Sequence, residues 1–96
     1  MTFEWDENKN AINQRKHGVD FIEASSVFYD DKAIMFNDPD HSDEEERFLL
    51  IGMSKMLRVL TVCHCYRSSD EVIRLISARK ATKTETEYYE QIGGRL

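Results

Sequence analysis

The chain has 96 residues, of which 41% are hydrophobic and 32% are charged, and its formal net charge at pH 7 is −5. This length predicts one domain over residues 1–96 with a single core, and the composition is that of a globular rather than a disordered chain. No apolar run approaches the roughly 20 residues that cross a bilayer, and the acidic start lacks the apolar stretch of a secretory signal. The sequence therefore predicts a cytoplasmic protein without a membrane anchor.

The charges are distributed unevenly along the chain. From Asp38 to Glu46 there are six acidic residues and no Lys or Arg. From Arg47 to Thr82 there are two acidic residues and seven basic ones, which are Arg47, Lys55, Arg58, Arg67, Arg74, Arg79 and Lys80. The overall negative charge argues against a general nucleic-acid coat protein, whereas the local excess of positive charge predicts an anion-binding site.

The N-terminal part predicts a short strand and two helices. Residues 3–5 alternate between apolar and polar side chains, as in a strand. Asp6 then serves as the N-cap of a helix over residues 7–17, which ends at Gly18 because glycine readily adopts the left-handed conformation. A second helix follows at once, in which Asp20 and Glu23 form a capping box and three residues face the core: Phe21, Ala24 and Phe28.

The remainder predicts four strands and a closing helix. The strands are placed at residues 33–36, 47–54, 57–66 and 71–81, with a turn at 68–70. Thr82 and Glu85 form a capping box for a last helix that extends to about Ile92. The order β-α-α-β-β-β-β-α predicts an α+β fold, in which two N-terminal helices and a C-terminal helix pack on a mainly antiparallel sheet.

The first helix has an unusual polar face. Only two of its eleven residues are apolar, so packing alone should stabilise it little. Lys9, Asn13 and Lys16 fall at positions i, i+4 and i+7 on one face, with His17 beside them. This face is either simply solvated, with its last cations favourable at the negative helix end, or it binds an anion.

Two arginines of the last strand fall on opposite faces by strict alternation. Arg74 lies within an otherwise apolar face and therefore needs an acidic partner or an anion, because an unpaired buried Arg is costly. Glu45 or Glu46 could supply that partner. A hairpin closed by residues 68–70 would place Arg74 opposite His64, on the same face, whereas Arg79 would lie on the other face at the strand end.

The cysteines and the acidic segment offer weaker signals. Cys63 and Cys65 are two residues apart on a strand, so they share one face and are interpreted as small buried thiols. The segment with Asp38, Asp40, His41 and Asp43 could suggest a divalent metal site. Acids along a flexible acidic loop are mostly solvated, however, so metal-dependent hydrolysis is the less favoured interpretation.

Three stretches together resemble the BrnT family of type II toxin–antitoxin toxins: "FEWDENKNAINQRKHGVDFIEASSVFYD", "HSDEEERFLLIG" and "RLISARKATKTETEYY". The family pattern Trp-Asp-x-x-Lys…Asn-x-x-Lys-His-Gly-Val is met by Trp5, Asp6, Lys9, Asn13, Lys16, His17, Gly18 and Val19. The pattern His-Ser-x-x-Glu-x-Arg is met by His41, Ser42, Glu45 and Arg47. The pattern Arg-x-Ile-Ser-Ala-Arg-x-Ala is met by Arg74, Ile76, Ser77, Ala78, Arg79 and Ala81.

The resemblance implies a RelE-like fold and a ribonuclease that inhibits translation. It also implies a cognate BrnA-like antitoxin with a ribbon-helix-helix part, through which alone the pair would bind operator DNA. A non-catalytic interaction subunit of such a complex is the alternative, and a metal nuclease built on the acidic segment is a third hypothesis.

A metal-independent ribonuclease needs a base for the 2′-hydroxyl, cations for the phosphorane and an acid for the leaving oxygen. Arg74 and Arg79, followed by Arg67, are the candidates for phosphate binding, and His17 is the candidate acid or base. The RNA backbone would contact Lys9, Asn13, Lys16 and Arg58. His41, Glu45 and Arg47 are placed in supporting positions, with His41 as a possible second acid or base, and no cofactor or metal is expected.

Overall fold

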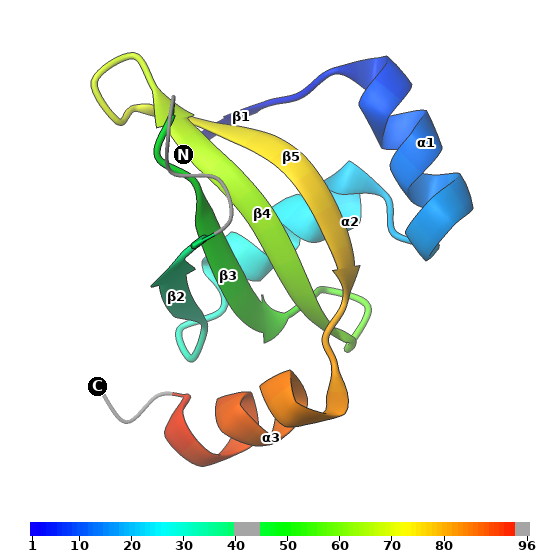
Figure 1. Cartoon of the computed structure of the whole chain (residues 1–96), viewed down its shortest axis with the longest axis vertical. Coiled ribbons are helices and arrows are strands. Elements are labelled where there is room, and N and C mark those ends of the chain that lie inside the picture. The colour runs from blue at the N-terminus through cyan, green and yellow to red at the C-terminus, as the bar shows by residue number, and fades with distance from the viewer. Residues whose placement is uncertain (40–44, 94–96) are drawn as a thin grey trace.

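The computed structural model describes residues 1–39 and 45–93 (Figure 1). Within them the elements are β1 (Thr2–Glu4), α1 (Glu7–His17), α2 (Phe21–Ser26), the 3₁₀ turn η1 (Val27–Tyr29), β2 (Ile34–Asn37), β3 (Phe48–Met53), β4 (Val59–Arg67), β5 (Val72–Lys80) and α3 (Lys83–Ile92). The predicted α+β class is confirmed. The strands form one sheet in the order β1-β5-β4-β3-β2, and the sheet is mixed because β1 runs parallel to β5 while the other neighbours are antiparallel.

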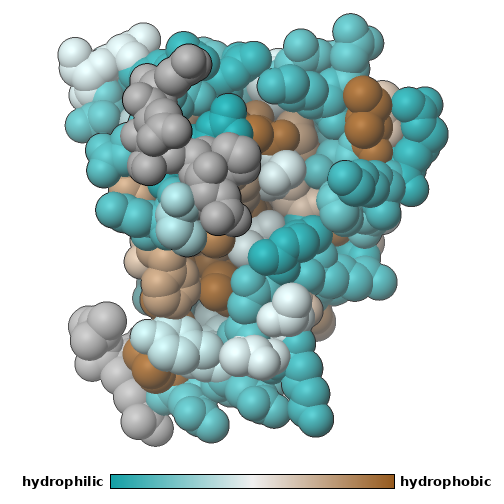
Figure 2. Space-filling model, viewed as in Figure 1, coloured by the Kyte–Doolittle hydropathy of each residue, from teal (hydrophilic) through white to brown (hydrophobic). Residues whose placement is uncertain are grey.

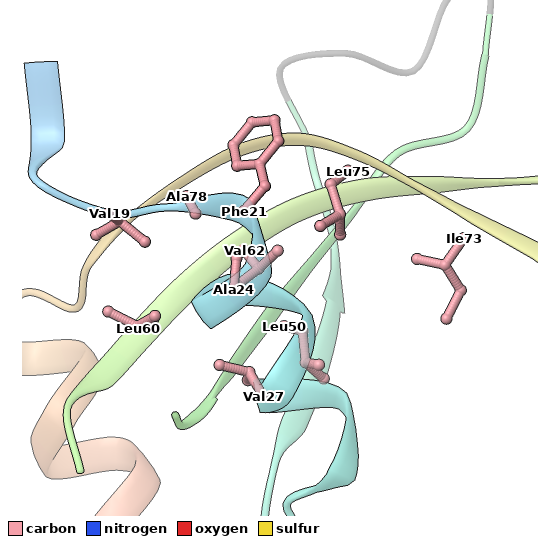
Figure 3. Close-up of a cluster of buried hydrophobic side chains, with 10 residues drawn as sticks. All are labelled: Val19, Phe21, Ala24, Val27, Leu50, Leu60, Val62, Ile73, Leu75 and Ala78. Carbon is pink, nitrogen blue, oxygen red and sulfur yellow. The ribbon is translucent and has the colours of Figure 1, made fainter. Parts of the chain in front are cut away.

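The hydrophobic core lies between one face of the sheet and the α2–η1 segment, which is behind the strands in Figure 1. Phe21, Ala24 and Val27 are fully buried there, and Phe28 packs against the same cluster, so the predicted core face of the second helix is confirmed. Figure 3 shows Phe21, Ala24 and Val27 together with the sheet residues of the same buried cluster, which are Leu50, Leu60, Val62, Ile73, Leu75 and Ala78. This side of the sheet is therefore closed to a ligand.

Local capping signals set the helix bounds. The Asp6 carboxylate accepts from the backbone amides of Asn8 and Lys9, and Gly18 ends α1 with φ of 68°. Thr82 and Glu85 form the predicted capping box of α3. The predicted capping box of α2 is wrong, because only Asp20 caps its helix, whereas the Glu23 side chain is buried.

Helix α1 packs on β5 through amides rather than apolar side chains. Asn10 and Asn13 are buried, whereas Ile12 is 52% exposed. The Asn13 side chain accepts from the backbone N–H of Ala78 (3.0 Å) and donates to the carbonyl oxygens of Ala78 (2.8 Å) and Val19 (2.9 Å). Asn13 thus continues the pairing of the β5 edge beyond β1, which covers only Val72–Arg74.

Strand β5 contains a bulge that the alternating pattern did not predict. Cys63 pairs with Ser77 and His64 with Leu75, so Ile76 is an extra residue on β5. A bulge of this kind reverses which side chains face the core. Arg74 and Arg79 therefore lie on the same face, and the predicted pairing of Arg74 with His64 is wrong, because Arg74 pairs with Cys65.

Candidate active site on the open face of the sheet

The face of the sheet opposite α2 carries the three arginines that were predicted to bind phosphate, Arg67, Arg74 and Arg79, and we call it the open face. Its members follow from the strand register and include Leu49, Ile51, Thr61, Cys63, Cys65, Arg67, Arg74, Ser77 and Arg79. Helix α3 crosses one end, where a hydrophobic groove of about 440 Å³ is lined by residues that include Phe36, Leu49, Ile51 and Tyr88. Figure 2 shows the brown and tan side chains of this hollow above α3.

At the end of the open face away from α3, arginines alternate with carboxylates. Arg74 Nη1 lies 2.7 Å from Glu4 Oε2, and Arg67 Nε lies 3.7 Å from the same oxygen. Glu45 lies 3.4 Å from Arg67 Nη2 and 3.6 Å from Arg47 Nε. We call these five residues the arginine–carboxylate chain. The predicted acidic partner of Arg74, Glu45 or Glu46, is wrong, since the partner is Glu4.

The arginine–carboxylate chain has three guanidinium groups and two carboxylates, so these five side chains carry an excess of one positive charge. The Arg67 side chain is 46% exposed and the Arg74 side chain is 27% exposed. Each guanidinium has five N–H donors, of which the ion pairs use only some. The arrangement can therefore accept a phosphate group from solvent.

Arg79 lies at the other end of the open face, on the order of 15 Å from Arg74 along the strand. Its Nη1 and Nη2 donate to the two oxygens of Glu85 at 2.7 and 3.0 Å. Glu85 also accepts from Thr61 and from the backbone of Thr82, and the hydrogen bonds from Arg79 are the main reason that its pKa falls to about 2. Arg79 thus joins β5 to the start of α3.

The two cysteines lie between these arginine groups. Both are buried free thiols on one face, as predicted. Burial raises the pKa of Cys63 to about 11 and also raises the pKa of Cys65. Thiols in this state are protonated at neutral pH and are poor nucleophiles.

The candidate RNA-binding residues of α1 differ in their exposure to solvent. Lys9 and Lys16 are exposed, whereas Asn13, which was predicted to contact RNA, is buried and bonds through its amide to Val19 and Ala78. His17 is partly buried at the end of α1. Among the described contacts, none joins His17 to Arg74 or Arg79.

Arg58 has a structural partner that the sequence did not indicate. Its guanidinium forms an ion pair with Glu23, whose side chain is 4% exposed, and donates to the carbonyl oxygen of Gly18 at 3.1 Å. The hydrogen bond from Arg58 is the main reason that the pKa of Glu23 is lowered. Arg58 therefore holds α2 against the turn between β3 and β4, and it is not a free RNA-binding cation.

The acidic segment is only partly described. His41, Asp40 and Asp43 lie outside the described residues, and Asp38 is 8% exposed. No cluster of three or more His, Cys, Asp or Glu side chains within residues 1–39 and 45–93 could hold a metal ion. Glu45 and Arg47, which were placed in supporting positions, belong to the arginine–carboxylate chain.

Sequence reasoning missed Glu4. The available signal was its position between Phe3 and Trp5 in an alternating strand, which places its side chain opposite the core. The partner strand was not predictable, because the parallel pairing of β1 with β5 joins residues 70 positions apart.

An α+β domain with arginines on the sheet face opposite α2 fits a small enzyme acting on RNA phosphates, and the comparisons with known proteins agree. A family model for the ribonuclease toxin of type II toxin–antitoxin systems matches residues 5–85. That family is BrnT, and this chain belongs to it.

A solved structure supports the same assignment. The chain is similar to the ribonuclease toxin BrnT of Brucella abortus, with 27% sequence identity, a TM-score of 0.65, and coverage of 86% of this chain and 99% of that one. A search of curated proteins finds no match. Within the described residues, no helix has the length and apolar character that a membrane span requires.

Proposed function

We propose that this chain is the toxin of a type II toxin–antitoxin pair and cleaves RNA without a metal ion, so that translation in the cytoplasm stops. The observation that carries the proposal is the arginine–carboxylate chain on the open face. Arg67 and Arg74 would bind the scissile phosphate and stabilise the charge that develops on the phosphorane. Arg79, further along the same face, would bind a phosphate more than one nucleotide away from the scissile one.

The helix α1 would extend the RNA contact. Lys9 and Lys16 are exposed cations without an ion-pair partner among the described residues. They would hold the RNA backbone, whose affinity for the protein rests mainly on such phosphate contacts. His17, the candidate acid or base from the sequence, lies at the end of this helix, and no described contact joins it to Arg74 or Arg79, so it would contribute to binding of the RNA backbone. RNA bound along the edge of β5 would have to reach both α1 and the open face.

The partner of the toxin is proposed to be a BrnA-like antitoxin with a ribbon-helix-helix part. It would neutralise the toxin and carry the complex to operator DNA. The RelE-like relationship of the fold is part of the same proposal. The hydrophobic groove between α3 and the sheet lies beside Arg79, so an antitoxin segment seated there would also obstruct the open face.

The test is expression of the chain in a bacterial host with and without the small protein encoded beside it. We expect growth arrest, RNA fragments that end in a 2′,3′-cyclic phosphate, and rescue by the neighbouring protein. Arg67→Ala with Arg74→Ala should abolish cleavage, whereas the exposed Arg15→Ala should not. Cleavage that EDTA stops would favour the metal nuclease. A complex with the neighbour but no cleavage would favour the interaction subunit.

A further inference from the structure

A metal-independent cleavage needs a group that takes the proton of the 2′-hydroxyl, and the arginines cannot supply it because they stay protonated. The following inference rests on the proposed function and concerns this base. The base must be accessible from the open face and must lie beside the guanidinium groups that bind the scissile phosphate. Few of the described residues meet both conditions.

Several titratable groups fail one of these conditions. The thiols of Cys63 and Cys65 are protonated, as their raised pKa values require. His64 is fully buried on the core side, where its ring lies against Phe28 and Phe48. Glu85 is at the far end of the face and already accepts hydrogen bonds from Arg79, Thr61 and Thr82.

The arginine–carboxylate chain itself contains two carboxylates, and Glu4 is the better placed. Glu4 Oε2 lies between Arg74 and Arg67, whereas Glu45 lies between Arg67 and Arg47. Glu4 belongs to a strand and pairs in register with Arg74, whereas Glu45 precedes β3 and is not part of a regular element. A catalytic group is held more accurately on a strand than on a loop.

The neighbours of Glu4 fix the direction of its side chain. The Phe3 ring packs on Phe28 with centroids 5.3 Å apart, and the Trp5 ring packs on Phe21 at 6.1 Å. Because side chains alternate along a strand, anchoring these two rings in the core directs Glu4 to the open face. Its side chain is 41% exposed, so it can reach a substrate. Glu4 precedes residues 5–85, which match the family model.

We propose that Glu4 is the general base of this ribonuclease. Its carboxylate removes the proton of the 2′-hydroxyl while that oxygen bonds to phosphorus. Arg67 and Arg74 stabilise the phosphorane, the bond to the 5′ oxygen breaks, and this oxygen takes a proton from water. Glu4 then returns its proton to the resulting hydroxide. The products are a 2′,3′-cyclic phosphate and a 5′-hydroxyl, and no water is consumed.

The test compares Glu4→Gln with wild type on a short RNA whose cleavage site has been mapped. Glutamine can still accept a hydrogen bond from Arg74, but it cannot take a proton at neutral pH. We expect kcat to fall about 100-fold or more. Affinity for the same RNA carrying a 2′-deoxy nucleotide at the cleavage site should not weaken, and the acidic limb of the pH–rate profile should disappear.

Two further variants complete the experiment. Glu4→Asp keeps a carboxylate and should retain more activity than Glu4→Gln. The control is Glu71→Gln, which changes an exposed carboxylate immediately before β5 and should match wild type. A Glu4→Gln variant with kcat within threefold of wild type overturns the assignment of Glu4 as the general base. A loss of affinity in Glu4→Gln equal to the loss of cleavage also overturns it, in favour of a role in positioning Arg74. If wild type cleaves no RNA, the proposed function fails as well.

Discussion

The polar face of α1 could stabilise the fold or bind RNA, and the substitution Asn13→Ala distinguishes these two roles. The Asn13 amide satisfies three backbone groups, namely the N–H and carbonyl of Ala78 and the carbonyl of Val19. All three lie in a buried environment. If the side chain is removed, these groups lose their partners within the fold, and α1 loses its main polar attachment to β5.

The magnitude follows from the cost of leaving buried polar groups unpaired. Each such group costs about 1 kcal/mol or more, so three of them cost about 3 kcal/mol. Alanine is the better helix former at an interior position, which returns up to about 0.7 kcal/mol. We therefore expect Asn13→Ala to lower the free energy of unfolding by about 2.5 kcal/mol, a large share of the stability of a small domain.

Urea unfolding followed by circular dichroism measures this change, and Asn8→Ala is the matched control. Asn8 lies on the same helix but is exposed, and it should change the free energy of unfolding by less than about 0.5 kcal/mol. Under conditions where Asn13→Ala remains folded, its affinity for RNA should equal that of wild type. Unchanged unfolding together with weakened RNA binding would refute the structural role.

Three further predictions concern buried or paired ionisable groups. Burial lowers the pKa of His64 to about 4, below its unfolded value of 6.5. The contribution of His64 to the free energy of unfolding is therefore complete above pH 6.5 and falls by about 3 kcal/mol as the pH drops to 4. Thermal unfolding of His64→Phe should lack most of this pH dependence. Arg58→Ala leaves the buried Glu23 carboxylate unpaired and should cost about 3 kcal/mol in urea unfolding, against less than about 0.5 for Lys55→Ala. Arg79→Ala should speed amide hydrogen exchange in α3, whereas Arg74→Ala, which has no contact with α3, should not.

The helix bounds were predictable because the signals are local. A capping carboxylate, a left-handed glycine and a Thr–Glu capping box act within a few residues of the helix end, and all three function as expected at Asp6, Gly18 and Thr82. Glu23 shows the limit of such a signal. Its side chain could form a local capping bond, but Arg58 and Ser54 offer a charged and a hydroxyl partner from 35 and 31 residues away.

The first helix was misjudged because amphipathicity counts apolar side chains only. Its buried positions are two asparagines. The amide of Asn13 replaces the backbone partners that a further strand would have supplied to β5, and the side chain of Asn10 accepts from the backbone N–H of Phe21 in α2. The helical spacing predicted one shared polar face for Lys9, Asn13 and Lys16. In the structure the Asn13 side chain is buried, whereas both lysines are exposed. Sequence periodicity cannot distinguish a buried amide from a solvated one unless its partners are known.

The site depends on the bulge at Ile76 more than on any single predicted residue. With strict alternation, Arg79 would face the core, opposite to Arg74, and the open face would keep one arginine of β5 instead of two. The extra residue lets Leu75 and Ala78 both remain buried in the core while Arg74 and Arg79 both face outward. The pattern of buried residues in β5 contained this information, since Ile73 and Leu75 are odd-numbered and Ala78 is even-numbered. Bulges at functional sites redirect side chains in this way, and here the same insertion serves the core and the arginine-bearing face together.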